Sequence, residues 1–103
     1  MVYCLNGEID TFGIFPLRYV SASENMLTVG KSYLGRGNGF VFTHLEYPGD
    51  IPAGFAYATG FMTYRYDTLT ITLFSYQSSS LALNSCQWIP STGEYIWRGW
   101  KTL

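Results

Sequence analysis

Seven acidic side chains are the residues of this sequence best suited to act as general acids, bases or nucleophiles. They are Glu8, Asp10, Glu24, Glu46, Asp50, Asp67 and Glu94. Hydrolysis of a glycosidic bond needs two carboxyl groups that flank the bond, and the closest pairs in the sequence are Glu8 with Asp10 and Glu46 with Asp50. Neither pair belongs to a recognisable catalytic motif, so we interpret these acids as turn carboxylates. A glycan depolymerase that uses Glu46 or Asp50 is the alternative.

One histidine and two cysteines offer little further chemistry. His44 falls on the same face of a predicted strand as Glu46, and such a pair can tune a proton acceptor but is more typical of a surface or interface. Cys4 and Cys86 could form one disulfide, although their apolar and small neighbours favour two buried thiols. The spacing of these residues matches no metal site. We therefore expect no metal, no cofactor and no enzymatic activity.

Aromatic side chains are the strongest remaining signal, because 18% of the residues are aromatic. Sugar rings stack on Trp and Tyr, while Gln and Arg can bind their hydroxyl groups. The candidate glycan surface therefore consists of Gln87, Trp88, Tyr95, Trp97, Arg98 and Trp100. The alternative is that these rings form the core of a small β domain.

The spacing of the tryptophans predicts how they divide between the two faces of the sheet. Trp97 and Trp100 lie three residues apart in one predicted strand, which places them on opposite faces, so at most one of them should belong to the core. Trp88 precedes a turn and Trp97 follows it, so these two rings could meet across a hairpin.

Length and charge narrow the class of protein. A chain of 103 residues fits one domain. Charged residues make up 13% of the sequence and the net charge is −1, with scattered basic residues that form no phosphate-binding patch, so we expect no nucleic-acid partner. We also expect no membrane insertion, because no apolar run is long enough to span a bilayer, and no signal peptide, because the first residues lack its pattern.

Residues 39–103 read as strands separated by turns. The clearest strand is Thr68 to Phe74, in which leucine and isoleucine alternate strictly with threonine, so that the threonine face meets solvent or another copy of the chain. The other predicted strands are Phe40 to Tyr47, Gly60 to Tyr66, Leu81 to Ile89 and Glu94 to Trp100. Short connections predict an all-β fold, a small antiparallel sandwich or curled meander sheet. A parallel α/β fold is excluded by the lack of crossover helices.

Residues 1–38 are harder to assign within this single domain of residues 1–103. Residues 22–25 could form one helical turn capped by Ser21 or Ser23. The glycines at 35, 37 and 39 predict a loop with unusual backbone angles.

Two landmarks give the sequence a resemblance to a known family. The ending Trp97-Arg98-Gly99-Trp100-Lys101-Thr102-Leu103 resembles the W-x-x-W-x-x-hydrophobic terminus of the knob-like β modules of phage tail fibres and pyocins. The loop Asp50 to Gly54 followed by the strand from Gly60 is similar to the Pro-containing loop and Gly-started strand of the same modules. Where the family has Tyr-x-Arg before the last turn, this chain has Cys86-Gln87-Trp88. The resemblance covers residues 39–103.

The resemblance implies a virion tail module, assembled in the bacterial cytoplasm. Its expected partners are two further copies in a homotrimer, other tail or baseplate proteins, and a bacterial surface glycan or other host receptor. We expect receptor binding through the aromatic surface, and keep a purely structural trimerisation or capping knob as the alternative.

Overall fold

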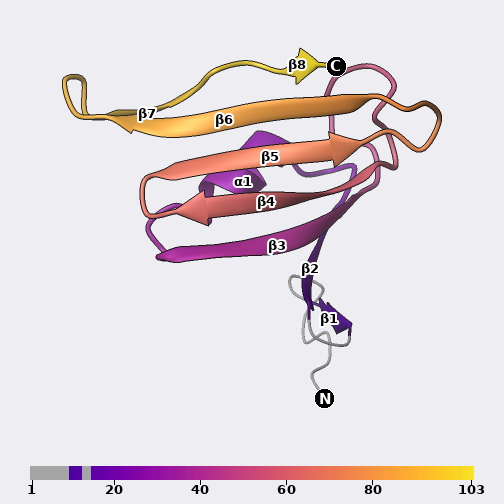
Figure 1. The fold of residues 1–103 in the computed structure, drawn as a ribbon, viewed down its shortest axis with the longest axis horizontal. Coiled ribbons are helices and arrows are strands. Elements are labelled where there is room, and N and C mark those ends of the chain that lie inside the picture. The colour runs from indigo at the N-terminus through magenta and orange to yellow at the C-terminus, as the bar shows by residue number, and fades with distance from the viewer. Residues whose placement is uncertain (1–9, 13–14) are drawn as a thin grey trace.

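The protein forms one β-sheet with a short helix on one of its faces (Figure 1). The structure, a computed structural model, describes residues 10–12 and 15–103. The strands are β1 (Asp10–Phe12), β2 (Phe15–Val20), β3 (Asn38–Leu45), β4 (Thr59–Arg65), β5 (Thr68–Phe74), β6 (Leu81–Ile89), β7 (Glu94–Trp97) and β8 (Lys101–Thr102), and the helix is α1 (Met26–Lys31). The predicted all-β fold class is confirmed.

The sheet is mainly an antiparallel meander. Strands β3, β4, β5, β6 and β7 are neighbours in chain order, and β8 pairs with β6 beside β7. The meander form of the prediction is therefore confirmed. The sandwich form is not, because the described strands make one sheet and α1 supplies the second layer.

The N-terminal part adds a parallel pair that the sequence analysis did not predict. β2 and β3 run parallel, with Leu17 opposite Phe42 and Val20 opposite Leu45. The chain between them contains α1, so β2, α1 and β3 form a crossover unit, the connection that a parallel pair requires. The expectation that the chain has no crossover helix was wrong at this edge, because the short helix carries too few residues to show a helical pattern.

The core lies between α1 and one face of the sheet. Alternate residues of the central strands point toward α1, and Met62, Ile71 and Leu73 are fully buried there. Met26 of α1 is also fully buried. A Cβ atom added to Gly30 would lie 3.2 Å from Cδ1 of Ile71, which shows how closely the helix backbone approaches β5. Figure 1 shows α1 behind β4 and β5.

The helix begins later than predicted and takes its cap from a distant residue. Asn25 occupies the N-cap position but makes no side-chain cap bond. Instead, the carboxylate of Asp50 accepts the N–H groups of Met26 and Leu27 at 2.8 and 2.9 Å. The predicted cap by Ser21 or Ser23 was wrong, because residues 22–24 form a turn and bend before the N-cap residue Asn25.

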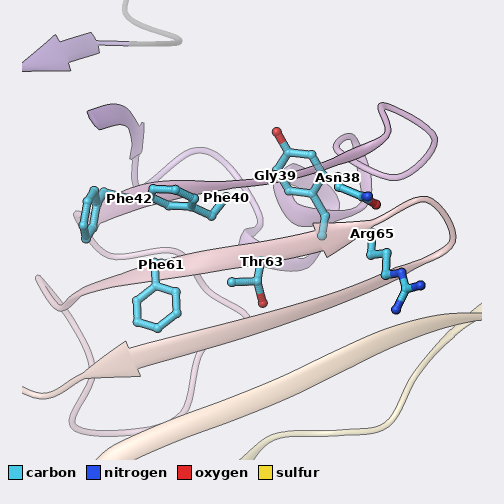
Figure 2. Close-up of a pocket in the computed structure, with 8 residues that line it drawn as sticks. Asn38, Gly39, Phe40, Phe42, Phe61, Thr63 and Arg65 are labelled. Carbon is cyan, nitrogen blue, oxygen red and sulfur yellow. The ribbon is translucent and has the colours of Figure 1, made fainter. Parts of the chain in front are cut away.

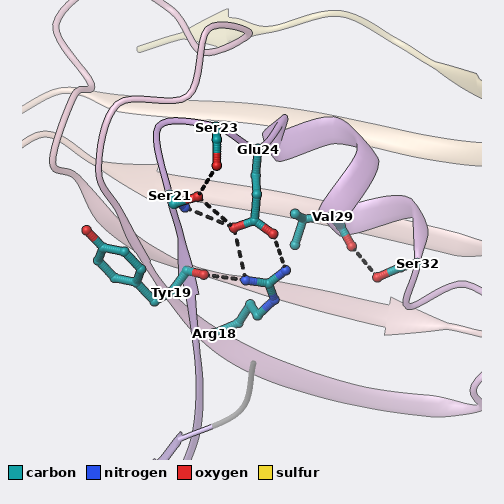
Figure 3. A network of polar contacts seen from close by, with 7 residues as sticks. All are labelled: Arg18, Tyr19, Ser21, Ser23, Glu24, Val29 and Ser32. Atoms are coloured by element: carbon teal, nitrogen blue, oxygen red, sulfur yellow. Dashed lines mark hydrogen bonds and ion pairs between the residues drawn. The ribbon is translucent and has the colours of Figure 1, made fainter. Parts of the chain in front are cut away.

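Ser21 belongs to a polar network in front of the helix (Figure 3). The carboxylate of Glu24 accepts the backbone N–H of Ser21 at 3.0 Å and pairs with the guanidinium of Arg18 at 2.6 Å. The hydrogen bond from Arg18 holds the pKa of the Glu24 carboxyl below its usual value, while partial burial acts in the opposite direction. Arg18 also donates to the carbonyl of Tyr19. The network fixes the end of β2 to the turn that leads into α1.

This lowered pKa predicts a pH-dependent contribution to stability. A carboxyl whose pKa is lower in the folded state stabilises the fold fully above its unfolded value of about 4.5, and this contribution disappears as the pH falls through the folded value. We expect Glu24→Gln to lower the free energy of unfolding by at most about 1 kcal/mol at pH 7. The difference from the unsubstituted protein should shrink as the pH falls below about 4.5 and vanish once the Glu24 carboxyl is protonated in the folded protein. Urea unfolding across this pH range measures it, and a difference that stays constant with pH would contradict the assignment.

The last predicted strand is interrupted. β7 ends at Trp97, and Gly99 has a positive φ of 101°. The backbone N–H of Gly99 donates to Oδ1 of Asn84 at 3.0 Å, which holds the interruption against β6. Both Trp97 and Trp100 pack against the core. The prediction that only one could do so was wrong, because the interruption of the strand at residues 98–100 breaks the two-residue period.

The loop glycines and the cysteines also bear on the sequence predictions. Gly35 and Gly37 have positive φ values of 85° and 92°, as the loop prediction required, whereas Gly39 lies within β3.

Cys86 is a fully buried free thiol, and burial raises its pKa. Cys4 lies outside the described residues.

Candidate functional site

The face of the sheet that points away from α1 is the candidate site, which we call the open face. It arises from strand alternation: in β5, for example, Leu69, Ile71 and Leu73 are buried while Thr70 and Phe74 are not. Its residues are Phe40, Phe42, Phe61, Thr63, Thr70, Thr72, Phe74, Leu81, Leu83 and Ser85. A sheet normally packs both apolar faces against other layers. At Phe61 and Phe74, no helix or second sheet of the described residues covers this face.

Apolar side chains of the open face lie side by side across the strands. The pairing register aligns Phe42 with Phe61, Phe61 with Thr72, and Thr72 with Leu83. Phe61 and Phe74 contact each other, with ring centroids 6.0 Å apart. Phe74 is 41% exposed. A contiguous aromatic and aliphatic patch of this kind marks an interaction surface in soluble proteins.

A shallow hollow of about 640 Å³ lies over β3 and β4. Figure 2 shows the rings of Phe40, Phe42 and Phe61 at one end of the hollow and Asn38 and Arg65 at the other. Carbon atoms dominate its surface, so it offers van der Waals contact and few hydrogen bonds. The hollow suits an apolar side chain of a partner better than a hydroxyl-rich sugar.

Charged residues are confined to the margins of the open face. Arg65 is the last residue of β4, Glu94 is the first of β7, and Lys101 lies opposite Leu83 at the outer edge. All three are exposed. The centre of the face can therefore be covered without burying a charge, while the margins can select the partner.

Three of the predicted glycan-binding residues share the face that carries α1. Trp88 and Tyr95 are register partners with ring centroids 5.0 Å apart, and Nζ of Lys31 lies 5.9 Å from the Tyr95 ring. Trp97 lies opposite Cys86 rather than opposite Trp88, so the predicted contact of two tryptophans across the hairpin was wrong.

Two more predicted residues lie on the other side of the sheet. These are Gln87 and Arg98. Gln87 follows the buried Cys86 and is exposed on the side of the open face, where its amide oxygen accepts a hydrogen bond from Arg98 at 2.7 Å.

Trp100 has a structural role, because its indole N–H donates to the carbonyl of Asp50 at 2.8 Å. The structure therefore divides the six predicted residues between the two faces and does not join them in one surface.

Glu46 and Asp50, the acids considered for a depolymerase, have structural partners, whereas Glu8 lies outside the described residues. Oε1 of Glu46 accepts the backbone N–H of Ala22 at 2.7 Å, and Asp50 caps α1. His44 is exposed on the open-face side of β3.

In the described part of the chain, no three His, Cys, Asp or Glu side chains gather as metal ligands. The described residues also include no helix long and apolar enough to cross a membrane.

Sequence reasoning missed the phenylalanines and leucines of the open face as site residues. A signal was present in β3, where Phe40 and Phe42 alternate with Val41, so that both faces of the strand are apolar. A strand that is apolar on both faces is covered on both faces. Only the threonine face of β5 was considered for contact with another copy, and that face lies at the centre of the open face.

Comparison with protein-family models, with curated proteins and with solved structures found no match. The open face and its chemistry are therefore the basis of the functional proposal.

Proposed function

We propose that this chain is a non-enzymatic assembly module whose open face binds the open face of a second copy of the same chain. The observation that carries the proposal is the contact between the half-buried Phe61 and the exposed Phe74, over which no helix or second sheet of the described chain lies. Its setting is the structural knob of a phage tail fibre or similar particle, which the C-terminal resemblance implies. Of the two functions that the resemblance suggests, the structural one has the stronger geometric support.

The size of the open face supports a copy of the chain as its partner. Five strands from β3 to β7 at about 4.8 Å spacing, each about 3.4 Å per residue over the seven residues of β5, give a flat area of about 570 Å². Two such faces amount to about 1,100 Å², which reaches the roughly 1,000 Å² that a specific interface needs. Stacked sheets pack about 10 Å apart, so two open faces would together make a sandwich, which the described part of one chain does not form.

Binding of a bacterial surface glycan has weaker geometric support. Stacking of a sugar ring needs exposed Trp or Tyr beside hydrogen-bonding groups. Trp88 and Tyr95 are half-buried on the α1 side, whereas Gln87 and Arg98 lie on the other side. The open face itself carries Phe and Leu, which bind other apolar side chains.

Phe74→Arg tests the assembly function. An arginine at this half-exposed position would place a charge inside the interface, and we expect it to weaken self-association by about 30-fold or more, the effect of losing a binding hot spot. Sedimentation equilibrium over a concentration series measures the association. Circular dichroism establishes that the variant is folded.

Tyr76→Arg is the matched control, because Tyr76 lies two residues further along the chain, is 63% exposed and stands outside β5. We expect this variant to associate like the unsubstituted protein. A protein that stays monomeric at about 100 µM, or a folded Phe74→Arg variant that associates as before, would contradict the proposed function, because an apolar interface of this size should form at that concentration.

A further inference from the structure

Strand β7 lies at the outer edge of the sheet and pairs with β6 alone among the described strands (Figure 1). The backbone N–H of Arg98 donates to the carbonyl of Ser85 in β6 at 2.8 Å, so Arg98 faces β6. Backbone groups of an antiparallel strand alternate between its two sides, which means that Tyr95 and Trp97 direct theirs away from β6. An exposed edge of this kind is a template for an added strand.

The sequence of this edge is complementary to itself in the antiparallel direction. Residues 94–98 read Glu-Tyr-Ile-Trp-Arg. Turning the segment end to end about Ile96 sets Glu94 opposite Arg98 and one aromatic residue opposite the other. Opposite charges and paired aromatic residues both stabilise neighbouring strands.

The side chains that would meet are accessible on the open-face side of β7. Ile96 is the register partner of Gln87 and is 38% exposed, and Glu94 and Arg98 are exposed as well. Within the described chain, the ion pair within 4.0 Å is that of Arg18 with Glu24, so Glu94 has no cation of its own. Arg98 donates to the amide oxygen of Gln87 and keeps further N–H groups for a carboxylate.

We infer that two copies of the chain join their β7 edges in antiparallel pairing about a two-fold axis at Ile96. Tyr95 of each copy then exchanges both backbone hydrogen bonds with Trp97 of the other, and Glu94 faces Arg98 at both ends. The axis is perpendicular to the sheet, so both open faces stay on one side of the joined sheet. This contact is additional to the proposed binding through the open face and does not rest on it.

Other self-pairings of the edge are less favourable. Antiparallel pairing about Tyr95 sets Glu94 opposite Ile96, and pairing about Trp97 sets Arg98 opposite Ile96. Each forms one hydrogen-bonded pair within β7, where the pairing about Ile96 forms two. Parallel pairing about an axis along the strand places each charge beside its own copy, which is destabilising. Hydrogen bonding and charge therefore select the same register.

A cross-link at the axis tests the inference. Ile96 would lie opposite its own copy with about 4.5 Å between the Cα atoms, within the range of a disulfide. We expect Ile96→Cys to form a disulfide-linked dimer with a mild oxidant. Glu94→Cys is the matched control, because its two copies would lie about 14 Å apart and should not cross-link. Non-reducing electrophoresis measures the dimer, and the unsubstituted protein reports any cross-link through the native cysteines.

A charge exchange in the Ile96→Cys protein tests the register. We expect Glu94→Arg to slow the cross-link about tenfold, because two arginines then face each other, and added Arg98→Glu to restore the rate. Adding Lys101→Glu in place of Arg98→Glu restores the net charge but not the pair, so the rate should stay low. Circular dichroism establishes that each variant is folded.

The outcomes separate this contact from the open-face contact. We expect the Ile96→Cys cross-link to persist when Phe74→Arg is added. No cross-link in a folded Ile96→Cys variant, equal cross-linking of Glu94→Cys, or loss of the cross-link with Phe74→Arg would overturn the inference. Equal recovery with Arg98→Glu and Lys101→Glu, or with neither, would also overturn it. The proposed function is judged separately, by the effect of Phe74→Arg on association of the protein without added cysteines.

Discussion

Gly60→Ala is expected to destabilise the fold by about 3 kcal/mol or more. A Cβ atom at position 60 would collide with the carbonyl oxygen of Thr72 and lie 2.9 Å from Cα of Leu73. Both are backbone atoms of β5, so no side-chain rotation can relieve the overlap, and the central pair of strands would have to separate. Such a loss is a large share of the roughly 5–15 kcal/mol that stabilises a domain. Denaturant unfolding measures it.

Gly49→Ala is the control for this prediction. No atom lies within 4 Å of a Cβ at position 49, and its φ is not positive, so the same chemical change should alter stability by less than about 1 kcal/mol. Equal stability of the two variants would contradict the close approach of β4 and β5 at Gly60.

Asp50→Ala is expected to cost about 2 kcal/mol, because Asp50 provides both side-chain acceptors at the start of α1. The N–H groups of Met26 and Leu27 would lose their carboxylate partner, and Asn25 offers no substitute. Thermal and denaturant unfolding measure the loss.

Asp50→Asn separates the cap from other effects of the residue. The amide keeps one acceptor oxygen and nearly the same volume, so we expect about half of the loss seen with alanine. The bond from Trp100 should persist in both variants, because it ends on the backbone carbonyl of Asp50. An alanine variant as stable as the unsubstituted protein would show that the helix does not depend on this cap.

The strands of the meander could be predicted from the sequence because their signals are local. Thr68–Phe74 and Leu81–Ile89 have the bounds that alternation and the flanking turns indicated. Alternation is visible there because one face is buried and the other carries threonine or mixed residues. β4 begins one residue before the predicted Gly60.

Features that depend on distant residues could not be predicted. Asp50 caps a helix more than 20 residues earlier in the chain, and no spacing rule connects the two. The parallel pairing of β2 with β3 likewise depends on how α1 packs on the sheet. The interruption of the last strand at Gly99, which has a positive φ, changed the placement of Trp100.

The candidate site shows the same division between local and distant information. The sequence identifies aromatic residues but does not say which face of the sheet is covered. The tryptophans, which have the largest rings, are half-buried on the α1 side. Phe61 and Phe74 contact each other on the opposite face, where Phe74 is exposed. Which face α1 covers therefore decides which rings can bind a partner.

The junction at Asp50 also bears on how the chain folds. Its side chain binds residues 24 and 23 positions earlier, and its carbonyl binds Trp100, 50 positions later. Helix, loop and last strands thus share one contact region. Contacts of such long sequence separation slow folding, because long loops must close before these contacts form, so we expect Asp50 to set part of the folding rate of this small sheet.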